Sequence, residues 1–484
     1  MILQIDLTGK NGLANSFWGD FTSSTTPKPE RRYIADDGQM VSGYYNAFEK
    51  YGYLAPGLAL TTAVTVDSAT YAGGAWRCSL VDPINGAFYI GSGQYLYKAS
   101  TLDASNLTTA LDLTTTGTPD ILDLEVYQIN GAAQKLFVVY ETGGNTEIAI
   151  SNLPYDTATD NLTWLSVTVA GTAGAEALSS SAFMRVADNG FAYLFRDNRV
   201  DKIDGTSGGG TNGTITNNIL LFPYHFRIAD AIDYKGRMFV ALHQYPSVDS
   251  VSGAIPLEVG IYIWDRQSTV YGTVDYIVLR GAKRILKIFI SPNGTLRLIT
   301  ENSSLLTEIR EFTGSTFEVI ETLGREAYPQ HHDSMFSTGL VTSWLGFSGK
   351  IFSYGKTAPG EKEGIFLRGY TVQSGTSGAG AVVYSSLSGD RMYLTYDSPT
   401  KARYYGFTTN GDGNATKLQG DIFTPVKFFP LMSTVKNIGI YMRQETVSST
   451  ATAATIKIYF NGSAAVVMTK TVVRNDVNKG YVNF

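Results

Sequence analysis

Residues 283–322, KRILKIFISPNGTLRLITENSSLLTEIREFTGSTFEVIET, contain four short strand patterns separated by turn residues. Ile285–Ile290 is rich in β-branched and aromatic side chains, and Thr295–Thr300 returns with alternating faces after the turn sequence Pro292-Asn293-Gly294. Two further strand patterns follow, at Leu306–Phe312 and Phe317–Ile320. This stretch therefore predicts a four-stranded antiparallel unit.

A short turn of this kind recurs along the chain, each time beside an aromatic-rich strand pattern. Successive turns lie 40 to 59 residues apart, at Asn85-Gly86, Asn130-Gly131, Asn189-Gly190, Lys235-Gly236, Asn293-Gly294, Ser348-Gly349 and Ser388-Gly389. Four-stranded units repeat at this pitch in β-propellers. Seven turns predict seven blades, or six if one unit is misread.

Pairs of apolar strand patterns with little alternation accompany these turns. They are Leu136–Tyr140 with Glu147–Ile150, Phe191–Phe195 with Arg199–Ile203, Arg237–Leu242 with Gly260–Trp264, and Arg391–Tyr396 with Ala402–Phe407. A strand that is buried on both faces has this pattern. We expect each pair to form the inner strands of one blade.

The patterning changes at both ends of the chain. Residues 1–60 are interrupted by Gly and Pro, and residues 426–484 contain cleanly alternating strand patterns. We predict an all-β fold with three parts: an extended N-terminal arm (1–60), a six- or seven-bladed β-propeller (61–425), and a small C-terminal antiparallel β-sheet domain (426–484). The last residues, Tyr481–Phe484, read as a strand that pairs with another chain or continues into further residues.

Composition agrees with this fold and excludes several classes of function. The chain has 50 Gly, 30 Tyr and 24 Phe, a bias towards tight turns and half-buried strand positions. Charged residues make up 17% and the net charge is −5, which gives no basic surface for wrapping nucleic acid. Cys78 is the only cysteine and reads as a small buried strand residue. We find neither a signal-peptide pattern nor a membrane-spanning apolar run, so we expect synthesis in a host cytoplasm.

One loop has oxygen ligands at alternating positions, as a calcium loop does. The ligands would be Asn410, Asp412, Asn414 and, at the twelfth position, Asp421. However, Ala415 stands where such loops have Gly, and no Glu supplies a bidentate ligand. An ordinary hairpin loop is therefore the favoured interpretation, and we predict no metal or other cofactor.

No catalytic motif is present, and we predict that the chain is not an enzyme. It lacks a Gly-X-Ser-X-Gly elbow, a P-loop and a His-Glu-X-X-His sequence. Aromatic residues of the N-terminal arm have no core of their own to enter. We predict that they make assembly contacts with a neighbouring subunit; these residues are Trp18, Tyr44, Tyr45, Tyr51 and Tyr53.

Segments at both ends resemble those of a known class of proteins. Asp6–Asn15, Ala35–Val41 and Gly52-Tyr-Leu-Ala-Pro-Gly57 resemble the opening of tail and neck structural proteins of tailed bacteriophages. There, a Gly- and Asn-rich leader precedes a Gly-X-Leu-X-Pro-Gly turn and then a propeller. The segment from Phe423 through the strand patterns at 436–470 is similar to the small sheet that follows the propeller in such proteins.

This resemblance implies a structural role in the virion. The chain would form a tail or neck ring, as a nozzle or hub, that retains and conducts the genome. Its expected partners are further copies of itself, in a ring with six-fold symmetry, other tail or neck proteins, and genomic DNA in passing. Two alternatives stay open: a receptor- or glycan-binding propeller, and a glycosidase with two carboxylates roughly 5–10 Å apart near the central axis.

Overall fold

The computed structural model describes most of the central part of the chain and short strands elsewhere. The described residues are 40–43, 45–46, 55–56, 62–66, 76–84, 86–99, 106–113, 119–128, 134–142, 145–153, 165–168, 182–204, 214–246, 256–272, 275–291, 293–329, 335–337, 341–346, 350–356, 363–370, 382–385, 391–395, 401–406, 420–423, 439–440, 454–458, 468–472 and 482–483. Regular structure in these residues is β-strand, apart from one 3-10 turn at Arg325–Ala327. None of their helical segments has the length and apolar character needed to cross a membrane. The all-β prediction is confirmed.

The chain divides into two compact units. The first contains residues 1–59, 353–369 and 406–484, and the second contains residues 60–352 and 370–405.

Four successive sheets of the second unit each consist of four consecutive antiparallel strands. Their strands are β9 (Asp120–Gln128), β10 (Gln134–Thr142), β11 (Asn145–Asn152) and β12 (Leu165–Thr168); β13 (Phe183–Val186), β14 (Ala192–Arg196), β15 (Arg199–Asp204) and β16 (Thr214–Leu221); β17 (Phe226–Tyr234), β18 (Arg237–Gln244), β19 (Glu258–Trp264) and β20 (Tyr276–Val278); and β21 (Ala282–Ile290), β22 (Leu296–Asn302), β23 (Thr307–Phe312) and β24 (Phe317–Leu323). The four-stranded unit predicted within 283–322 is therefore confirmed.

A larger sheet of eight strands combines two groups from distant parts of the sequence. In order, its strands are β29 (Val382–Ser385), β30 (Arg391–Thr395), β31 (Lys401–Gly406), β4 (Thr62–Val66), β8 (Asn106–Asp112), β7 (Tyr95–Ala99), β6 (Phe88–Ser92) and β5 (Trp76–Val81). Only β4 and β8 pair in parallel, through two residue pairs. Each group on either side of this short ladder is a four-stranded set.

The remaining strands form smaller sheets. One four-stranded sheet has the order β25 (Met335–Ser337), β26 (Val341–Leu345), β27 (Lys350–Lys356) and β28 (Glu363–Tyr370). Two-stranded sheets pair β1 (Met40–Gly43) with β32 (Gly420–Phe423), β2 (Tyr45–Asn46) with β3 (Ala55–Pro56), β33 (Gly439–Ile440) with β36 (Val482–Asn483), and β34 (Ala454–Ile458) with β35 (Met468–Val472). The terminal strand β36 thus has a partner within the chain, β33.

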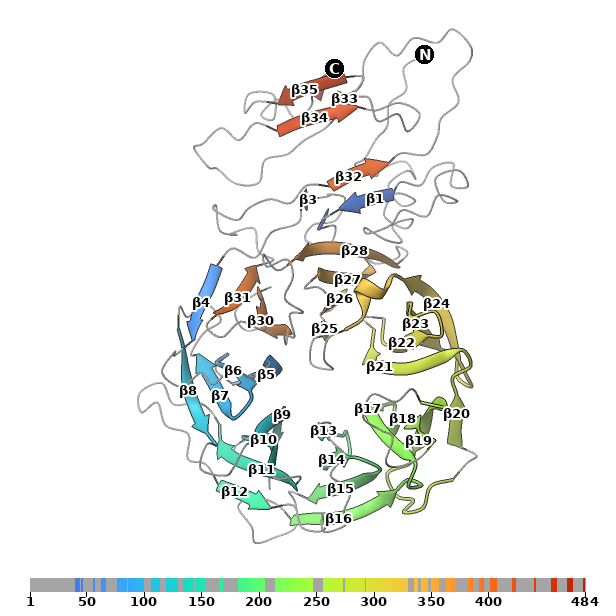
Figure 1. Cartoon of the computed structure of the whole chain (residues 1–484). Coiled ribbons are helices and arrows are strands. Elements are labelled where there is room, and N and C mark those ends of the chain that lie inside the picture. The colour runs from blue at the N-terminus through green and yellow to red at the C-terminus, as the bar shows by residue number, and fades with distance from the viewer. Residues whose placement is uncertain are drawn as a thin grey trace. The chain divides into compact units, whose positions relative to one another are not determined.

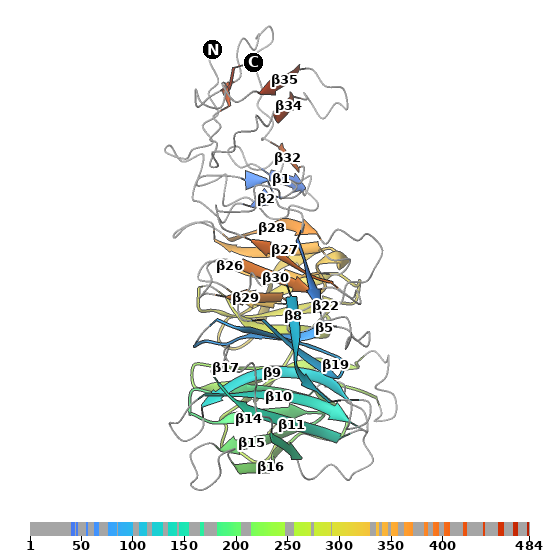
Figure 2. The same cartoon turned by 90° about the vertical axis from the view of Figure 1, so that its left-hand side faces the viewer.

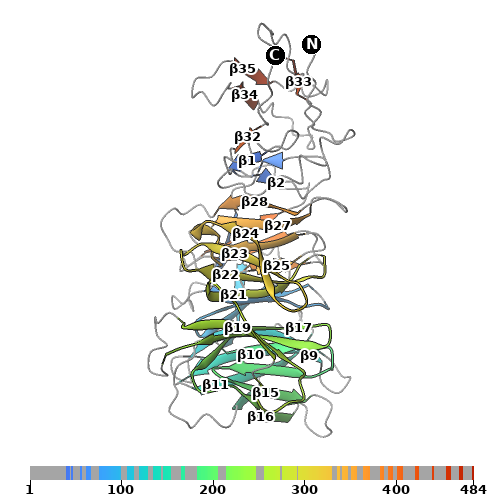
Figure 3. The same cartoon turned by 90° about the vertical axis from the view of Figure 1, so that its right-hand side faces the viewer.

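The sheets of the second unit are arranged like those of propeller-like folds. Figure 1 shows the first strands β9, β13, β17 and β21 nearest a common centre and the last strands β12, β16, β20 and β24 outside them. The first strands β9, β13 and β17 each contact the first strand of the next sheet, which is β13, β17 and β21, respectively. In the side views, β9, β10 and β11 lie next to one another in this order in Figure 2, and β21, β22 and β23 do so in Figure 3.

The hydrophobic core lies between successive sheets. One cluster joins β13–β16 to β17–β20 and includes Phe195, Phe222 and Trp264. Another joins the latter sheet to β21–β24 through Phe239, Ile261 and other apolar side chains. All five residues of β14 are buried, which explains why its sequence shows little alternation. Full burial of one large apolar side chain contributes about 1.5–3 kcal/mol, so these interfaces dominate the stability of the unit.

The predicted hairpin turns occur where first and second strands of a sheet connect. Asn189-Gly190, Lys235-Gly236 and Asn293-Gly294 join β13 to β14, β17 to β18 and β21 to β22. In the second of these turns Lys235 has φ 50° and Gly236 has φ 79°. Two positive φ angles fit a two-residue turn whose twist matches the flanking strands. These three turns of the predicted series are confirmed.

Candidate functional site: a charged network on four first strands

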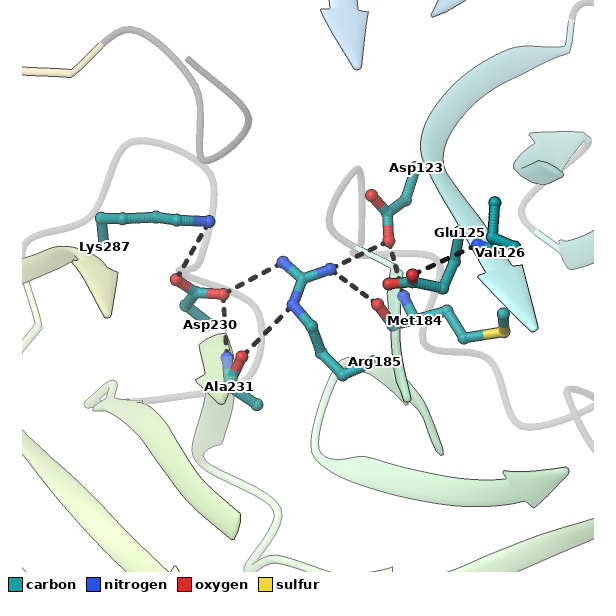
Figure 4. A network of polar contacts seen from close by, with 8 residues as sticks. All are labelled: Asp123, Glu125, Val126, Met184, Arg185, Asp230, Ala231 and Lys287. Atoms are coloured by element: carbon teal, nitrogen blue, oxygen red, sulfur yellow. Dashed lines mark hydrogen bonds and ion pairs between the residues drawn. The ribbon is translucent and has the colours of Figure 1, made fainter. Parts of the chain in front are cut away.

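Four charged side chains with alternating sign connect the first strands of four successive sheets (Figure 4). Asp123 lies on β9, Arg185 on β13, Asp230 on β17 and Lys287 on β21. Arg185 Nη1 lies 3.2 Å from Asp123 Oδ2, and its Nη2 lies 3.3 Å from Asp230 Oδ1. Lys287 Nζ lies 3.5 Å from Asp230 Oδ2. Each charged group in the network therefore contacts only groups of the opposite charge within the network.

Both carboxylates also accept backbone hydrogen bonds from the next sheet. Asp123 Oδ2 accepts the N–H of Met184 on β13 at 2.7 Å. In the same way, Asp230 Oδ2 accepts the N–H of Ile288 on β21 at 2.9 Å. These amides belong to first strands, which have no partner strand on their inner side. The carboxylates therefore satisfy donors that the sheets themselves leave open.

A β-bulge precedes three members of the network by one residue. The pairing of first and second strands shifts between Ile121 and Asp123, between Ile228 and Asp230, and between Ile285 and Lys287. A bulge changes the direction of the side chains that follow it. Asp123, Asp230 and Lys287 therefore each follow a β-bulge in the first strand of their sheet.

Burial determines the electrostatics of this network. Asp123 and Asp230 have side chains that are 1% exposed, whereas Arg185 and Lys287 are 18% and 13% exposed. Burial raises the pKa of the Asp123 carboxyl, while the Arg185 charge and the Met184 amide oppose that rise. Taking a charge out of water costs several kcal/mol, so these ions depend on one another for compensation.

Tyrosine hydroxyls form a second set of links between the same sheets. Tyr127 at the end of β9 donates to the carbonyl of Gly190, at 2.7 Å. Tyr234 at the end of β17 donates to the carbonyl of Gly294, at 3.1 Å. Both acceptors belong to the Asn-Gly turns of the next sheet. In each first strand the tyrosine follows the network aspartate by four residues, so an Asp-X-X-X-Tyr segment joins each of two sheets to its successor.

The arrangement favours a structural role for both aspartates. Two carboxylates contact one guanidinium, so the network contains a pair of acids of the kind that a glycosidase needs. Both are almost fully buried, however, and each already accepts a backbone N–H. A sugar ring has no access to carboxylates with this exposure. Within the described residues no group of three His, Cys, Asp or Glu is placed to hold a metal ion.

The residues predicted from the sequence as sites lie mostly outside the described residues. This applies to Asn410, Asp412 and Asn414 of the calcium candidate, and to Trp18, Tyr44, Tyr51 and Tyr53 of the predicted assembly contacts. Asp421 lies on β32, where it pairs with Ser42 of β1, and Tyr45 lies on β2, where it pairs with Pro56 of β3. The prediction for Cys78 is confirmed, since this residue is fully buried on β5.

Sequence reasoning missed the network residues, although a signal for them exists. The segments Asp123-Leu-Glu-Val-Tyr127 and Asp230-Ala-Ile-Asp-Tyr234 share spacing, and each precedes a short turn. A search for spacings shared between the predicted blades would have found this Asp-X-X-X-Tyr segment in two of them. Arg185 and Lys287 have no such repeated context, and only the structure brings them together.

Comparisons with known proteins complete the description of the chain. No protein-family model matches it, and no curated protein does. Among solved structures it is similar to Raptor of Chaetomium thermophilum (TM-score 0.45, 8% identity, 72% of this chain), of which it spans 29%. It is also similar to the PQQ-bound aldose sugar dehydrogenase of Streptomyces coelicolor (TM-score 0.38, 11% identity, 76% of this chain and 100% of that one). A third similarity is to a chain of a mitotic checkpoint complex (TM-score 0.44, 10% identity, 74% and 99%).

Proposed function

We propose that the chain forms a seven-bladed β-propeller. The blades would be β5–β8, β9–β12, β13–β16, β17–β20, β21–β24, β25–β28, and a last blade in which β4 completes β29–β31. The pairing of β4 with β31 supports this proposal, because it joins a strand from the start of the repeats to a sheet from their end. Contacts of β5 with β29 and with β9 support it as well.

We further propose that the propeller is flanked by two assembly elements. These are the extended N-terminal arm (1–60) and the C-terminal β-sheet domain (426–484). The antiparallel pairing of β34 with β35 supports a small C-terminal sheet. In this proposal the arm aromatics, with Trp18 foremost, contact neighbouring subunits.

The function that these features support best is that of a non-enzymatic structural protein in the virion of a tailed bacteriophage. The observation that carries the non-enzymatic part is the charged network of Asp123, Arg185, Asp230 and Lys287. It uses buried ions to tie four sheets together and leaves neither aspartate accessible to a substrate. The virion part rests on the resemblance of the terminal segments to tail and neck proteins. In this role a ring of copies would retain and conduct the genome.

Removal of the N-terminal arm tests the proposal against its alternatives. The full chain and a variant lacking residues 1–57 would be compared by electron microscopy and by light scattering. We expect rings from the full chain and monomers that keep the β-rich circular dichroism spectrum from the variant. Rings that persist without the arm would contradict the proposed arm contacts. A full chain that stays monomeric and hydrolyses or binds glycans would favour the glycosidase or the glycan-binding propeller.

A further inference from the structure

A groove of about 470 Å³ lies between the outer parts of two neighbouring sheets of the second unit. Its lining residues come from β20, from the link between β20 and β21, from β23 and β24, and from the turn between these two strands. They are Val278, Arg280, Arg310, Thr316 and Phe317. Two of the five carry a guanidinium group, and two are apolar. This combination suits a ligand that has both an anionic and an apolar part.

Arg310 is fixed in the wall of the groove. Its side chain is 6% exposed, and Nε donates to Thr300 Oγ1 at 3.2 Å. Nη2 donates to Glu308 Oε2 at 2.7 Å, and Nη1 donates to the backbone carbonyl of Arg280 at 3.1 Å. The last bond holds the backbone of Arg280 beside the buried guanidinium. The buried Arg310 side chain thereby fixes the backbone position of Arg280.

Arg280 supplies the available charge of the groove. The residue is exposed, and within the described part of the chain its guanidinium makes no hydrogen bond or ion pair. Glu308 compensates the charge of Arg310 and is itself held by Asn302 Nδ2 at 2.8 Å. One positive charge is therefore left over in the groove. A single excess charge matches a carboxylate better than a doubly charged phosphate.

The apolar part of the groove lies beside this charge. Phe317 is 5% exposed as a residue, and its ring lies tilted by 37° against that of Phe312 with centroids 5.0 Å apart. Val278 on β20 is 42% exposed and has unburied apolar surface. An apolar ligand body placed here would cover Val278 while its carboxylate reaches Arg280.

We propose that this groove binds a carboxylate group attached to an apolar or aromatic body. Arg280 pairs with the carboxylate in a charge-assisted hydrogen bond, Arg310 holds the backbone of Arg280 in place, and Phe317 and Val278 contact the apolar part. The carboxylate comes either from a free small acid or from an acidic side chain of a peptide. The inference is independent of the proposed virion role.

Calorimetric titration of the full chain tests this site with matched probes. The small-molecule probe is phenylacetate, with phenylacetamide as its uncharged counterpart. The peptide probe is a blocked hexapeptide with a central Phe-Asp pair, with the Phe-Asn peptide as its counterpart. The variants are R280Q and, as a matched control, R237Q, which removes another exposed arginine, at the start of β18.

The site predicts that at least one carboxylate probe binds more tightly than its amide counterpart. R280Q should weaken that binding about tenfold, and R237Q should leave it within twofold. Binding of phenylacetate alone identifies a small acid as the ligand class, and binding of the peptide alone identifies an acidic segment. Equal binding of carboxylate and amide, or equal loss in R280Q and R237Q, overturns the proposal, as does the absence of binding by both carboxylates.

Discussion

Two neighbouring interfaces of the second unit both contain an ion pair of Arg185 but differ in their other links. Between β9 and β13, a buried carboxylate and a tyrosine hydroxyl bind backbone groups of the next sheet, through Asp123 to Met184 and Tyr127 to Gly190. Between β13 and β17, cations make the links. Arg185 binds Asp230 and the carbonyl of Ala231 in the interior.

A surface cluster adds to the second of these interfaces. Arg266 contacts Asp188 of one sheet and Asp233 of the next, and Asp233 accepts the N–H of Asp188 at 2.6 Å. The interface between β17 and β21 then returns to the first arrangement, with Asp230 and Tyr234 as its links. The difference teaches that neighbouring sheets can be joined either by buried acceptors of backbone N–H groups or by surface ion pairs. We expect the buried acceptors to contribute more to stability than the surface ion pairs.

The largest effect is expected from Asp230→Ala, because this side chain takes part in both kinds of interface. Its loss leaves Arg185 and Lys287 without their shared partner and the N–H of Ile288 without its acceptor. We expect a loss of about 3–5 kcal/mol in the free energy of unfolding, measured by urea denaturation. The exposed Asp275→Ala is the control, with an expected change below about 0.5 kcal/mol. A loss below 1 kcal/mol in Asp230→Ala would mean that the network does not hold the sheets together.

A smaller, pH-dependent effect is expected at the joint between β17–β20 and β21–β24. His243 Nε2 accepts the N–H of Ile285 at 3.0 Å, which requires a neutral ring. Burial and the Arg284 charge lower the pKa of His243 from 6.5 to about 4. Because the folded-state pKa is lower than the unfolded one, this contribution is complete above pH 6.5 and is lost as the pH falls towards 4. It amounts to no more than about 3 kcal/mol, and partial exposure of the ring reduces it.

His243→Gln isolates this contribution from the titration of carboxylates. Glutamine keeps an acceptor for the N–H of Ile285 and does not titrate. The difference in unfolding free energy between the wild type and the variant should therefore shrink between pH 6.5 and pH 4. A difference that stays constant over this range would show that the ring is not held neutral at the joint.

The tyrosine links should contribute less, and unequally. Tyr127→Phe removes a hydrogen bond of a buried residue, with an expected cost of about 1 kcal/mol. Tyr234→Phe removes the corresponding hydrogen bond from a half-buried residue, where the bond itself is exposed, so its cost should be smaller. Thermal unfolding of both variants measures this order. The reverse order would show that burial does not govern the strength of this link.

The smallest effect is expected from Asp188→Asn in the surface cluster. The Asp188 side chain is 59% exposed, so water and salt screen its ion pair with Arg266. We expect a slight decrease of the unfolding midpoint at low ionic strength that disappears in 1 M salt. Asp230→Ala should keep most of its effect at that salt concentration. An equal salt dependence of the two variants would remove the distinction between the buried and the surface links.

Much of the fold could be predicted from local patterns. The strands of residues 283–322 and three of the recurring turns are present in the structure, because turn chemistry and apolar runs are local properties of the sequence. The network of Asp123, Arg185, Asp230 and Lys287 depends on contacts between residues 45 to 62 positions apart. A local sequence pattern can single out one of these residues, but it does not predict which distant residue that side chain contacts. The pairing of β4 with β31 spans even more of the chain and was likewise not predicted.

Antibody-gold labelling of purified virus particles from the source, viewed by electron microscopy, tests the central claim most directly. The proposed structural role predicts gold at the tail or neck of each particle. Gold absent from every particle, with the protein detected only outside them, would contradict a virion role. The glycan-binding and glycosidase alternatives would then become the leading hypotheses.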